Sequence, residues 1–211
     1  MSLAAAPGKV SPAVLAEHLY PLNEFYAQAG FALPQIELIA GADVPEPYRQ
    51  LLVHNDDMTP TLEQYYGCDI HLAILRRRQE GVFYFREVVL RLDGSEQPVE
   101  FGANKISLAL FSPAVRRLIL AERLPLGHIL KVHQVPHTSR PQAYLRVQVD
   151  EFMGRSLGLA RGQVIYGRRN TLRDPQDRPL SEIVEILPPP AGPGTGTVAH
   201  AALATRKHRT D

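Results

Sequence analysis

The sequence predicts an α+β domain with a single antiparallel sheet of about six strands and with its helices packed on one face of that sheet. Apolar residues recur at helical spacing in the first third of the chain and with a period of two over most of residues 69–187. Successive strands are separated by turns such as Glu80-Gly81 and Asp93-Gly94-Ser95. These connections are too short for a crossover, so neighbouring strands must run antiparallel.

Composition fits one domain, residues 1–188, followed by a Pro/Gly-rich tail, residues 189–211, that we expect to be disordered. The chain has 211 residues, 45% of them hydrophobic, and a net charge of +1. Near-neutral charge argues against a nucleic-acid partner, and no apolar run reaches the length of a membrane span. The start does not resemble a secretory signal, and a single cysteine, Cys68, excludes an intramolecular disulfide. We therefore expect a cytoplasmic protein.

The first third of the chain carries helix signals. Ser11-Pro12 combines an N-cap residue with proline at the first helical position, and leucines and aromatic residues follow at helical spacing. Pro21 splits this helix, and Gly30 ends it. Two further short helices are expected over 46–53 and 60–66.

The strands are expected to form in two groups separated by helices. Between the groups, Ser112-Pro113 caps one helix and Pro125-Leu126-Gly127 opens another. No internal repeat is present. The strands rich in β-branched and aromatic residues cover 69–78, 82–92, 99–110, 142–152, 164–173 and 180–187.

The last strand contains two carboxylates, Glu182 and Glu185, inside an apolar run. Alternation places them on opposite faces, so one can point to solvent while the other faces the core or a pocket. A carboxylate among aliphatic neighbours costs free energy unless it is paired, protonated or functional. The residue types leave two interpretations open, a ligand-binding glutamate and a salt bridge to a nearby arginine.

Other candidate groups are weaker. No P-loop, GxGxxG, HExxH, CxxC or GxSxG motif occurs, which disfavours nucleotide cofactors and the common hydrolase sites. His128, His133 and His137 lie close in sequence without a cysteine or carboxylate at metal-ligand spacing, so we expect no metal site. Lys105 lies on the third strand, where a lone lysine is usually solvated.

Five segments, in this order over about 51–188, resemble the chorismate lyase family. They are Leu51-Leu52 with Asp57-Met58-Thr59; Arg86-Glu87-Val88-Val89-Leu90 with Asp93-Gly94; Pro125-Leu126-Gly127; Tyr166-Gly167-Arg168-Arg169; and the glutamate-bearing last strand ending in Leu187-Pro188. The resemblance implies a six-stranded antiparallel sheet with a ligand cavity closed by helical flaps. It also implies elimination of pyruvate from chorismate to give 4-hydroxybenzoate, with no metal or organic cofactor.

The resemblance also assigns residues to the site. Glu185 is the catalytic glutamate that bonds the hydroxyl end of the ring, with Glu182 as the alternative. Ala103 stands where members of the ubiquinone pathway have arginine. Lys105, two residues on, therefore supplies the positive charge, and it binds the ring carboxylate less firmly than an arginine would. Backbone groups of Met58, Thr59, Leu126 and Gly127 complete the site that the resemblance implies. The charge of the substrate adds Arg168, with Arg169 as the alternative, as the partner of the side-chain carboxylate.

Two alternatives to chorismate lyase stay open. A divergent member of the family would act on another aromatic or chorismate-derived acid. A non-catalytic sensor domain would bind an aromatic acid, because the same general fold serves some bacterial transcription regulators. The first 50 residues are neither basic enough nor organised as a helix-turn-helix, which favours an enzyme. Every alternative has a small molecule as partner, and the oligomeric state stays unknown.

Overall fold

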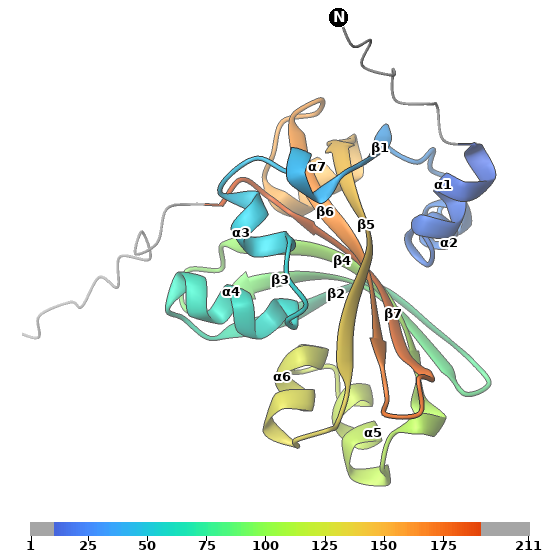
Figure 1. The fold of residues 1–211 in the computed structure, drawn as a ribbon. Coiled ribbons are helices and arrows are strands. Elements are labelled where there is room, and N and C mark those ends of the chain that lie inside the picture. Colours follow the sequence, from blue (N-terminus) through green and yellow to red (C-terminus); the bar gives the residue numbers. More distant parts are fainter. Residues whose placement is uncertain (1–10, 191–211) are drawn as a thin grey trace, which may run out of the picture.

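The computed structural model describes residues 11–190 and contains one antiparallel sheet of seven strands (Figure 1). Residues 1–10 and 191–211, which include most of the predicted tail, lie outside the described residues. The strand order is β1-β5-β6-β7-β4-β3-β2. The strands are β1 (Ile36–Ile39), β2 (Ile70–Glu80), β3 (Phe83–Leu92), β4 (Pro98–Ser107), β5 (Thr138–Gln148), β6 (Val164–Arg173) and β7 (Pro179–Leu187).

The sheet consists of two meanders, β2-β3-β4 and β5-β6-β7, which join where β4 pairs with β7. The antiparallel α+β class is confirmed, and all six predicted strands are present. The number six is wrong, because β1 adds a seventh strand at the edge beside β5. β1 is four residues long, and its partners lie more than a hundred residues away. Its own sequence therefore carried little signal.

Several helix ends lie where local signals place them, whereas the helix predicted over 60–66 begins earlier, at Met58. Ser11 and Ser112 each accept a hydrogen bond from the backbone N–H three residues on, and Gly67 ends its helix in the left-handed conformation at φ 64°. The helix at 151–157 was not predicted. The α-helices are α1 (Pro12–His18), α2 (Leu22–Gln28), α3 (Tyr48–Leu52), α4 (Met58–Tyr66), α5 (Pro113–Leu120), α6 (Leu126–Val132) and α7 (Glu151–Leu157).

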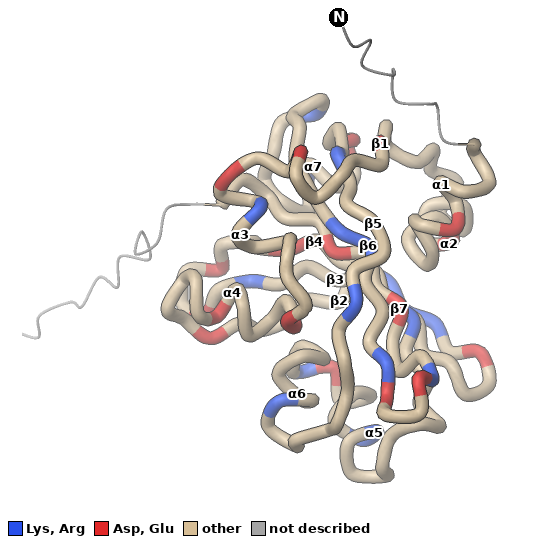
Figure 2. Tube along the Cα trace, in the orientation of Figure 1, with Lys and Arg blue, Asp and Glu red and all other residues tan. Residues whose placement is uncertain are grey.

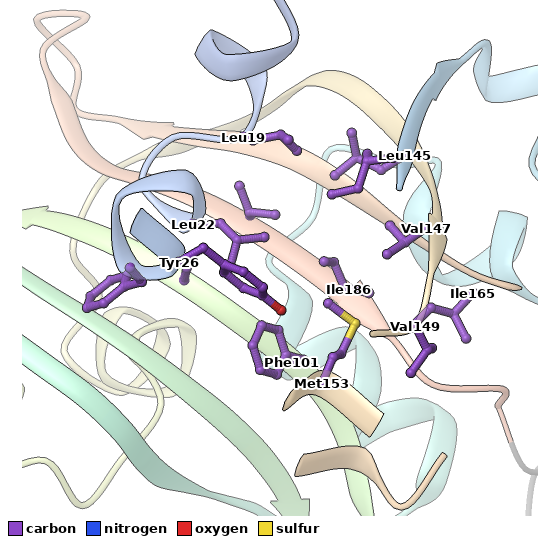
Figure 3. Packing of buried hydrophobic residues seen from close by; sticks show 14 of the residues in the cluster. Leu19, Leu22, Tyr26, Phe101, Leu145, Val147, Val149, Met153, Ile165 and Ile186 are labelled. Atoms are coloured by element: carbon purple, nitrogen blue, oxygen red, sulfur yellow. The ribbon is translucent and has the colours of Figure 1, made fainter. Parts of the chain in front are cut away.

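Helices cover both faces of the sheet, so the prediction that they pack on one face is wrong. On the face we call the α7 face, α1, α2 and α7 pack against Phe101, Ala103, Val184 and Ile186 (Figure 3). The reason lies in the central strands: β3, β4, β6 and β7 are buried on both faces, and each face needs its own cover.

The other face, which we call the pocket face, carries two apolar clusters. One lies under α3 and α4 and includes Leu52, Leu62 and Leu90. The second lies under α5 and α6 and includes Ile129 and Ile183. Figure 1 shows these two helix pairs as separate groups beside the sheet. Lysine or arginine residues lie next to aspartate or glutamate residues along the central strands (Figure 2).

No helix within residues 11–190 combines the length and apolarity needed to cross a bilayer.

Candidate functional site

A cavity of about 30 Å³ lies on the pocket face between the two apolar clusters. The start of α4, the start of α6 and strands β3, β4, β6 and β7 enclose it. It has room for about two water molecules. Its apolar walls are Val88, Leu90, Leu126, Leu172 and Ile183. Its polar and charged groups are Asp57, Arg86, Glu100, Asn104, Asn170 and Glu185.

Five of the residues that the sequence selected line this one cavity: Met58 and Thr59 at the start of α4, Leu126 and Gly127 at the start of α6, and Glu185 on β7. The two helices meet closely at Gly127. A Cβ at that position would lie 3.2 Å from the Thr59 Oγ1 atom, so a side chain there would push the helices apart.

Arg86 on β3 supplies a buried positive charge to the cavity. The residue is only 2% exposed, and its Nε donates to Asn104 Oδ1 at 3.1 Å. Its Nη1 has no hydrogen-bond partner within residues 11–190. Burial lowers the pKa of this guanidinium, because removal from water disfavours its charged form. Such a group is a ready site for a carboxylate, which accepts hydrogen bonds from guanidinium more strongly than a neutral acceptor does.

Sequence reasoning did not select Arg86 for the site, although a signal was present. Arg86 lies in an apolar strand, where an ionised group costs free energy unless it is paired or functional. The same conflict drew attention to Glu182 and Glu185.

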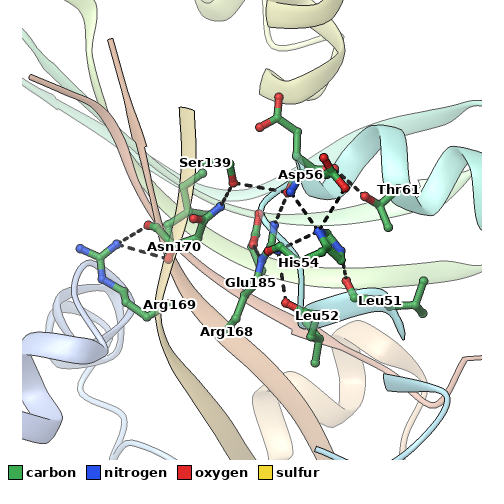
Figure 4. Close-up of polar contacts among 12 residues, drawn as sticks. Leu51, Leu52, His54, Asp56, Thr61, Ser139, Arg168, Arg169, Asn170 and Glu185 are labelled. Atoms are coloured by element: carbon green, nitrogen blue, oxygen red, sulfur yellow. Dashed lines mark hydrogen bonds and ion pairs between the residues drawn. The ribbon is translucent and has the colours of Figure 1, made fainter. Parts of the chain in front are cut away.

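Arg168 on β6 holds Glu185 in place. Its Nε lies 2.5 Å from Glu185 Oε2, and its Nη1 and Nη2 donate to the backbone carbonyls of Leu52, His54 and Asp56 at 3.0–3.3 Å (Figure 4). All three nitrogens are thus occupied.

Arg168 is absent from the residues that line the cavity. The structure therefore places it behind Glu185 rather than beside a substrate carboxylate. Its bonds tie β6 to the loop between α3 and α4, and this loop leads directly into Met58. Arg168 is a positioning residue in this geometry.

Lys105 lies on the α7 face, away from the cavity. In the β4–β7 register Lys105 pairs with Glu182, whereas Glu185 pairs with Gly102. The Lys105 Nζ lies 3.1 Å from Glu182 Oε2, and Arg169 Nη2 lies 2.9 Å from Glu182 Oε1. Because paired residues share a face and positions three apart do not, Lys105 and Glu185 cannot act in one site. The predicted pairing of these two residues is corrected accordingly.

Glu100 on β4 is a second buried carboxyl group at the cavity. It is 5% exposed, and its Oε2 has no hydrogen-bond partner in the described part of the chain. Burial first, and then the nearby Glu185 carboxylate, raise the pKa of Glu100 well above its usual range. The sequence analysis did not select this residue either.

Asp57, the N-cap residue of α4, lines the cavity and is paired with His137, which lies outside the cavity lining. Its Oδ2 lies 2.8 Å from His137 Nε2, and His137 Nδ1 lies 2.7 Å from the Val135 carbonyl oxygen. Both neighbours are acceptors, so the ring can donate to both only as an imidazolium. The bond to Asp57 raises the pKa of His137 accordingly. The other Asp57 oxygen, Oδ1, has no partner among residues 11–190.

Asn170 on β6 is the remaining amide of the cavity wall. Its Nδ2 donates to Ser139 Oγ at 2.9 Å, and its Oδ1 has no partner among the described residues (Figure 4). Among the described residues, the cavity thus has one nitrogen without a hydrogen-bond partner, Arg86 Nη1. It also has three side-chain oxygens without a partner, on Asp57, Glu100 and Asn170. Residues 11–190 hold no group of three His, Cys, Asp or Glu side chains that is arranged to bind a metal ion.

No protein-family model matches the chain, and no curated protein matches it. The chain is similar to several solved structures. One is PhnF from Mycobacterium smegmatis, with 10% identity, a TM-score of 0.47 and coverage of 79% of this chain and 92% of that chain. The effector domain of PhnF gives 12% identity, a TM-score of 0.47 and coverage of 63% and 88%.

A further similar structure is the ligand-binding domain of a putative GntR-family transcriptional regulator from Bordetella bronchiseptica. It gives 14% identity, a TM-score of 0.42 and coverage of 57% of this chain and 86% of that chain. All three TM-scores lie below 0.5, so these similarities do not establish a function.

Proposed function

We propose that this protein binds a small carboxylic acid with an apolar, aromatic body in the cavity between α4, α6 and the sheet. The observation that carries the proposal is the buried Arg86 guanidinium, whose Nη1 has no partner within residues 11–190. A ligand carboxylate would complete its hydrogen bonds and compensate its charge.

The walls of the cavity support an apolar body for this ligand. Aliphatic side chains from β3, β6, β7 and α6 line it around the charged groups. Small-molecule sites in proteins combine such apolar walls with a few polar groups that orient the ligand. Since the cavity is small as it stands, we expect the starts of α4 and α6, which touch at Thr59 and Gly127, to move apart on binding.

Calorimetric titration of the purified protein with benzoate and 4-hydroxybenzoate tests the proposal. We expect binding of both, and a loss of about 30-fold or more in affinity in Arg86→Met, because a charge-assisted pair contributes about 2 kcal/mol or more. Lys105→Met is the matched control, since it removes a cation from the opposite face of the same sheet. Binding of neither acid, or equal binding by Arg86→Met, would overturn the proposal.

A second candidate function is the cofactor-independent elimination of pyruvate from chorismate, leaving 4-hydroxybenzoate. One specific observation favours it: the residues that the family resemblance selected on α4, α6 and β7 line one cavity. In this candidate Arg86 takes the role that the sequence analysis assigned to Lys105, since Arg86 is the cation of the cavity wall.

Incubation with chorismate decides between turnover and binding alone. Lyase activity predicts pyruvate and 4-hydroxybenzoate in equal amounts, above the spontaneous rate, and a loss of both in Glu185→Gln. Ligand binding without any product would leave a sensor domain as the function. A divergent enzyme would bind chorismate without releasing pyruvate and would instead turn over a related aromatic acid.

A further inference from the structure

The position of Glu100 points to a specific selection rule for the proposed ligand. Glu100 and Arg86 line the same cavity, yet no ion pair or hydrogen bond joins them, and each keeps an atom without a partner among residues 11–190. An ionised Glu100 beside the Arg86 guanidinium would normally form an ion pair with it. Their separation indicates that each one contacts a different part of the ligand.

A glycine holds the Glu100 carboxyl group in position. Glu100 and Gly102 share a face of β4, and the Glu100 side chain lies along the strand over Gly102. A Cβ at position 102 would lie 2.7 Å from Glu100 Oε1. Gly102 is also the register partner of Glu185. The missing side chain at position 102 therefore leaves space for the Glu100 carboxyl group next to Glu185.

Burial favours the un-ionised form of Glu100, and the Glu185 carboxylate acts in the same direction, whereas Arg168 and Arg86 act against it. Glu185 faces it from β7, Arg168 from β6 and Arg86 from β3, and Asp57 lines the same cavity from the start of α4. Arg168 is already held by Glu185 at 2.5 Å, and Asp57 is paired with His137. Arg86 thus remains as the cation of the cavity wall that has no ion-pair partner among residues 11–190, which leaves room for one negative charge on the ligand.

Resting on the proposed function, we infer that Glu100 is the specificity-determining residue of this cavity and acts as a neutral carboxylic acid. It selects a ligand that has one carboxylate and, at the opposite end of its body, a hydroxyl group. The Glu100 O–H donates to the ligand hydroxyl oxygen, while the ligand carboxylate accepts from Arg86 Nη1. A second carboxylate in place of the hydroxyl is rejected, because it would face the Glu100 and Glu185 carboxyl groups.

Three probes test the inference on the wild-type protein: 4-hydroxybenzoate, benzoate, which lacks the hydroxyl group, and terephthalate, which replaces it by a carboxylate. At pH 7 we expect 4-hydroxybenzoate to bind about 10-fold more tightly than benzoate and at least about 10-fold more tightly than terephthalate. This series needs no variant, so it holds even if a substitution at position 100 prevents folding.

Three variants then separate selection from a structural role. Glu100→Gln keeps a neutral donor, so we expect it to retain the preference for 4-hydroxybenzoate. Glu100→Leu has no donor, and its ratio of benzoate to 4-hydroxybenzoate dissociation constants should fall to within about 2-fold of one. Gly102→Ala should lower the ratio as Glu100→Leu does, because the added Cβ displaces the carboxyl group.

The outcomes distinguish this inference from the proposed function. Wild-type binding of both monocarboxylates with equal affinity overturns the role of Glu100 and leaves the proposed function intact. An unchanged ratio of the benzoate and 4-hydroxybenzoate dissociation constants in folded Glu100→Leu likewise overturns the role of Glu100 and leaves the proposed function intact. Binding of neither probe overturns both the inference and the proposed function.

Discussion

The two faces of the central sheet strands carry the same kinds of charged residue in opposite circumstances. On the α7 face, Glu182 lies between Lys105 and Arg169, and the Lys105 and Glu182 side chains are 20% and 26% exposed. On the pocket face, Glu100 and Arg86 are buried, and each keeps an atom without a partner among residues 11–190.

The difference separates structural charges from functional ones. A partly exposed ion pair is satisfied by its partner and by water, and it contributes little to stability. A buried charge without a full set of partners destabilises the folded state, so its presence indicates a ligand that completes it. Residue type alone does not make this distinction, because glutamate and a basic residue occur on both faces.

The largest effect is expected at the buried pair of Arg168 and Glu185. Arg168→Met leaves Glu185 buried without its cation and removes the donors to the loop between α3 and α4. We expect a loss of about 3–5 kcal/mol in the free energy of unfolding, measured by urea denaturation.

A double variant sharpens this first test. Arg168→Met combined with Glu185→Leu removes both charges and should recover a large part of the lost stability, because a buried pair replaced by apolar residues is often neutral. A double variant as unstable as Arg168→Met alone would show that the backbone contacts of Arg168 to Leu52, His54 and Asp56, rather than the ion pair, carry the stability.

Arg86→Met should separate binding from stability. We expect the free energy of unfolding to stay unchanged or to rise by up to about 2 kcal/mol, since a poorly compensated buried charge is removed. The same variant should lose the affinity for aromatic carboxylates described above. A fall in stability of more than about 2 kcal/mol would mean that Arg86 is a structural residue, like those on the α7 face.

His137→Gln should change the pH dependence of stability by about 1 kcal/mol or less. The pKa of His137 is raised in the folded state, so its pair with Asp57 stabilises fully below the unfolded histidine pKa of about 6.5. The stabilisation disappears as the pH rises through the raised folded value. Urea denaturation should therefore show that the wild-type protein is more stable than His137→Gln at pH 6 but not at pH 9. An equal difference in the free energy of unfolding at both pH values would contradict this prediction.

The smallest effect is expected for Lys105→Met on the α7 face. Its pair with Glu182 is partly exposed, and Arg169 still holds the carboxylate, so the loss should be about 0.5 kcal/mol. Titration with benzoate should give a dissociation constant within about 2-fold of wild type. A large loss of affinity would show that Lys105 contributes to ligand binding, and the two faces would then not differ in function.

Local chemistry determined much of the secondary structure from the sequence alone. Ser11 and Ser112 cap their helices and Gly67 ends one, because these signals act through hydrogen bonds and dihedral angles within three or four residues. The alternation in the last strand likewise determined that Glu182 and Glu185 face opposite sides. For α7 a local signal was present in Asp150, which accepts from the Met153 N–H, but the preceding strand was expected to extend over Asp150 to residue 152.

Only the tertiary structure decided which residues meet. β1 forms because β5 pairs with it, and helices cover both faces because the central strands are buried on both sides. The register of β4 against β7 places Gly102 opposite Glu185 and sends Lys105 to the other face, whereas a shift by one residue would have reversed this arrangement. That register depends on contacts between distant segments, so no local pattern in β4 alone reveals which of its residues faces the cavity.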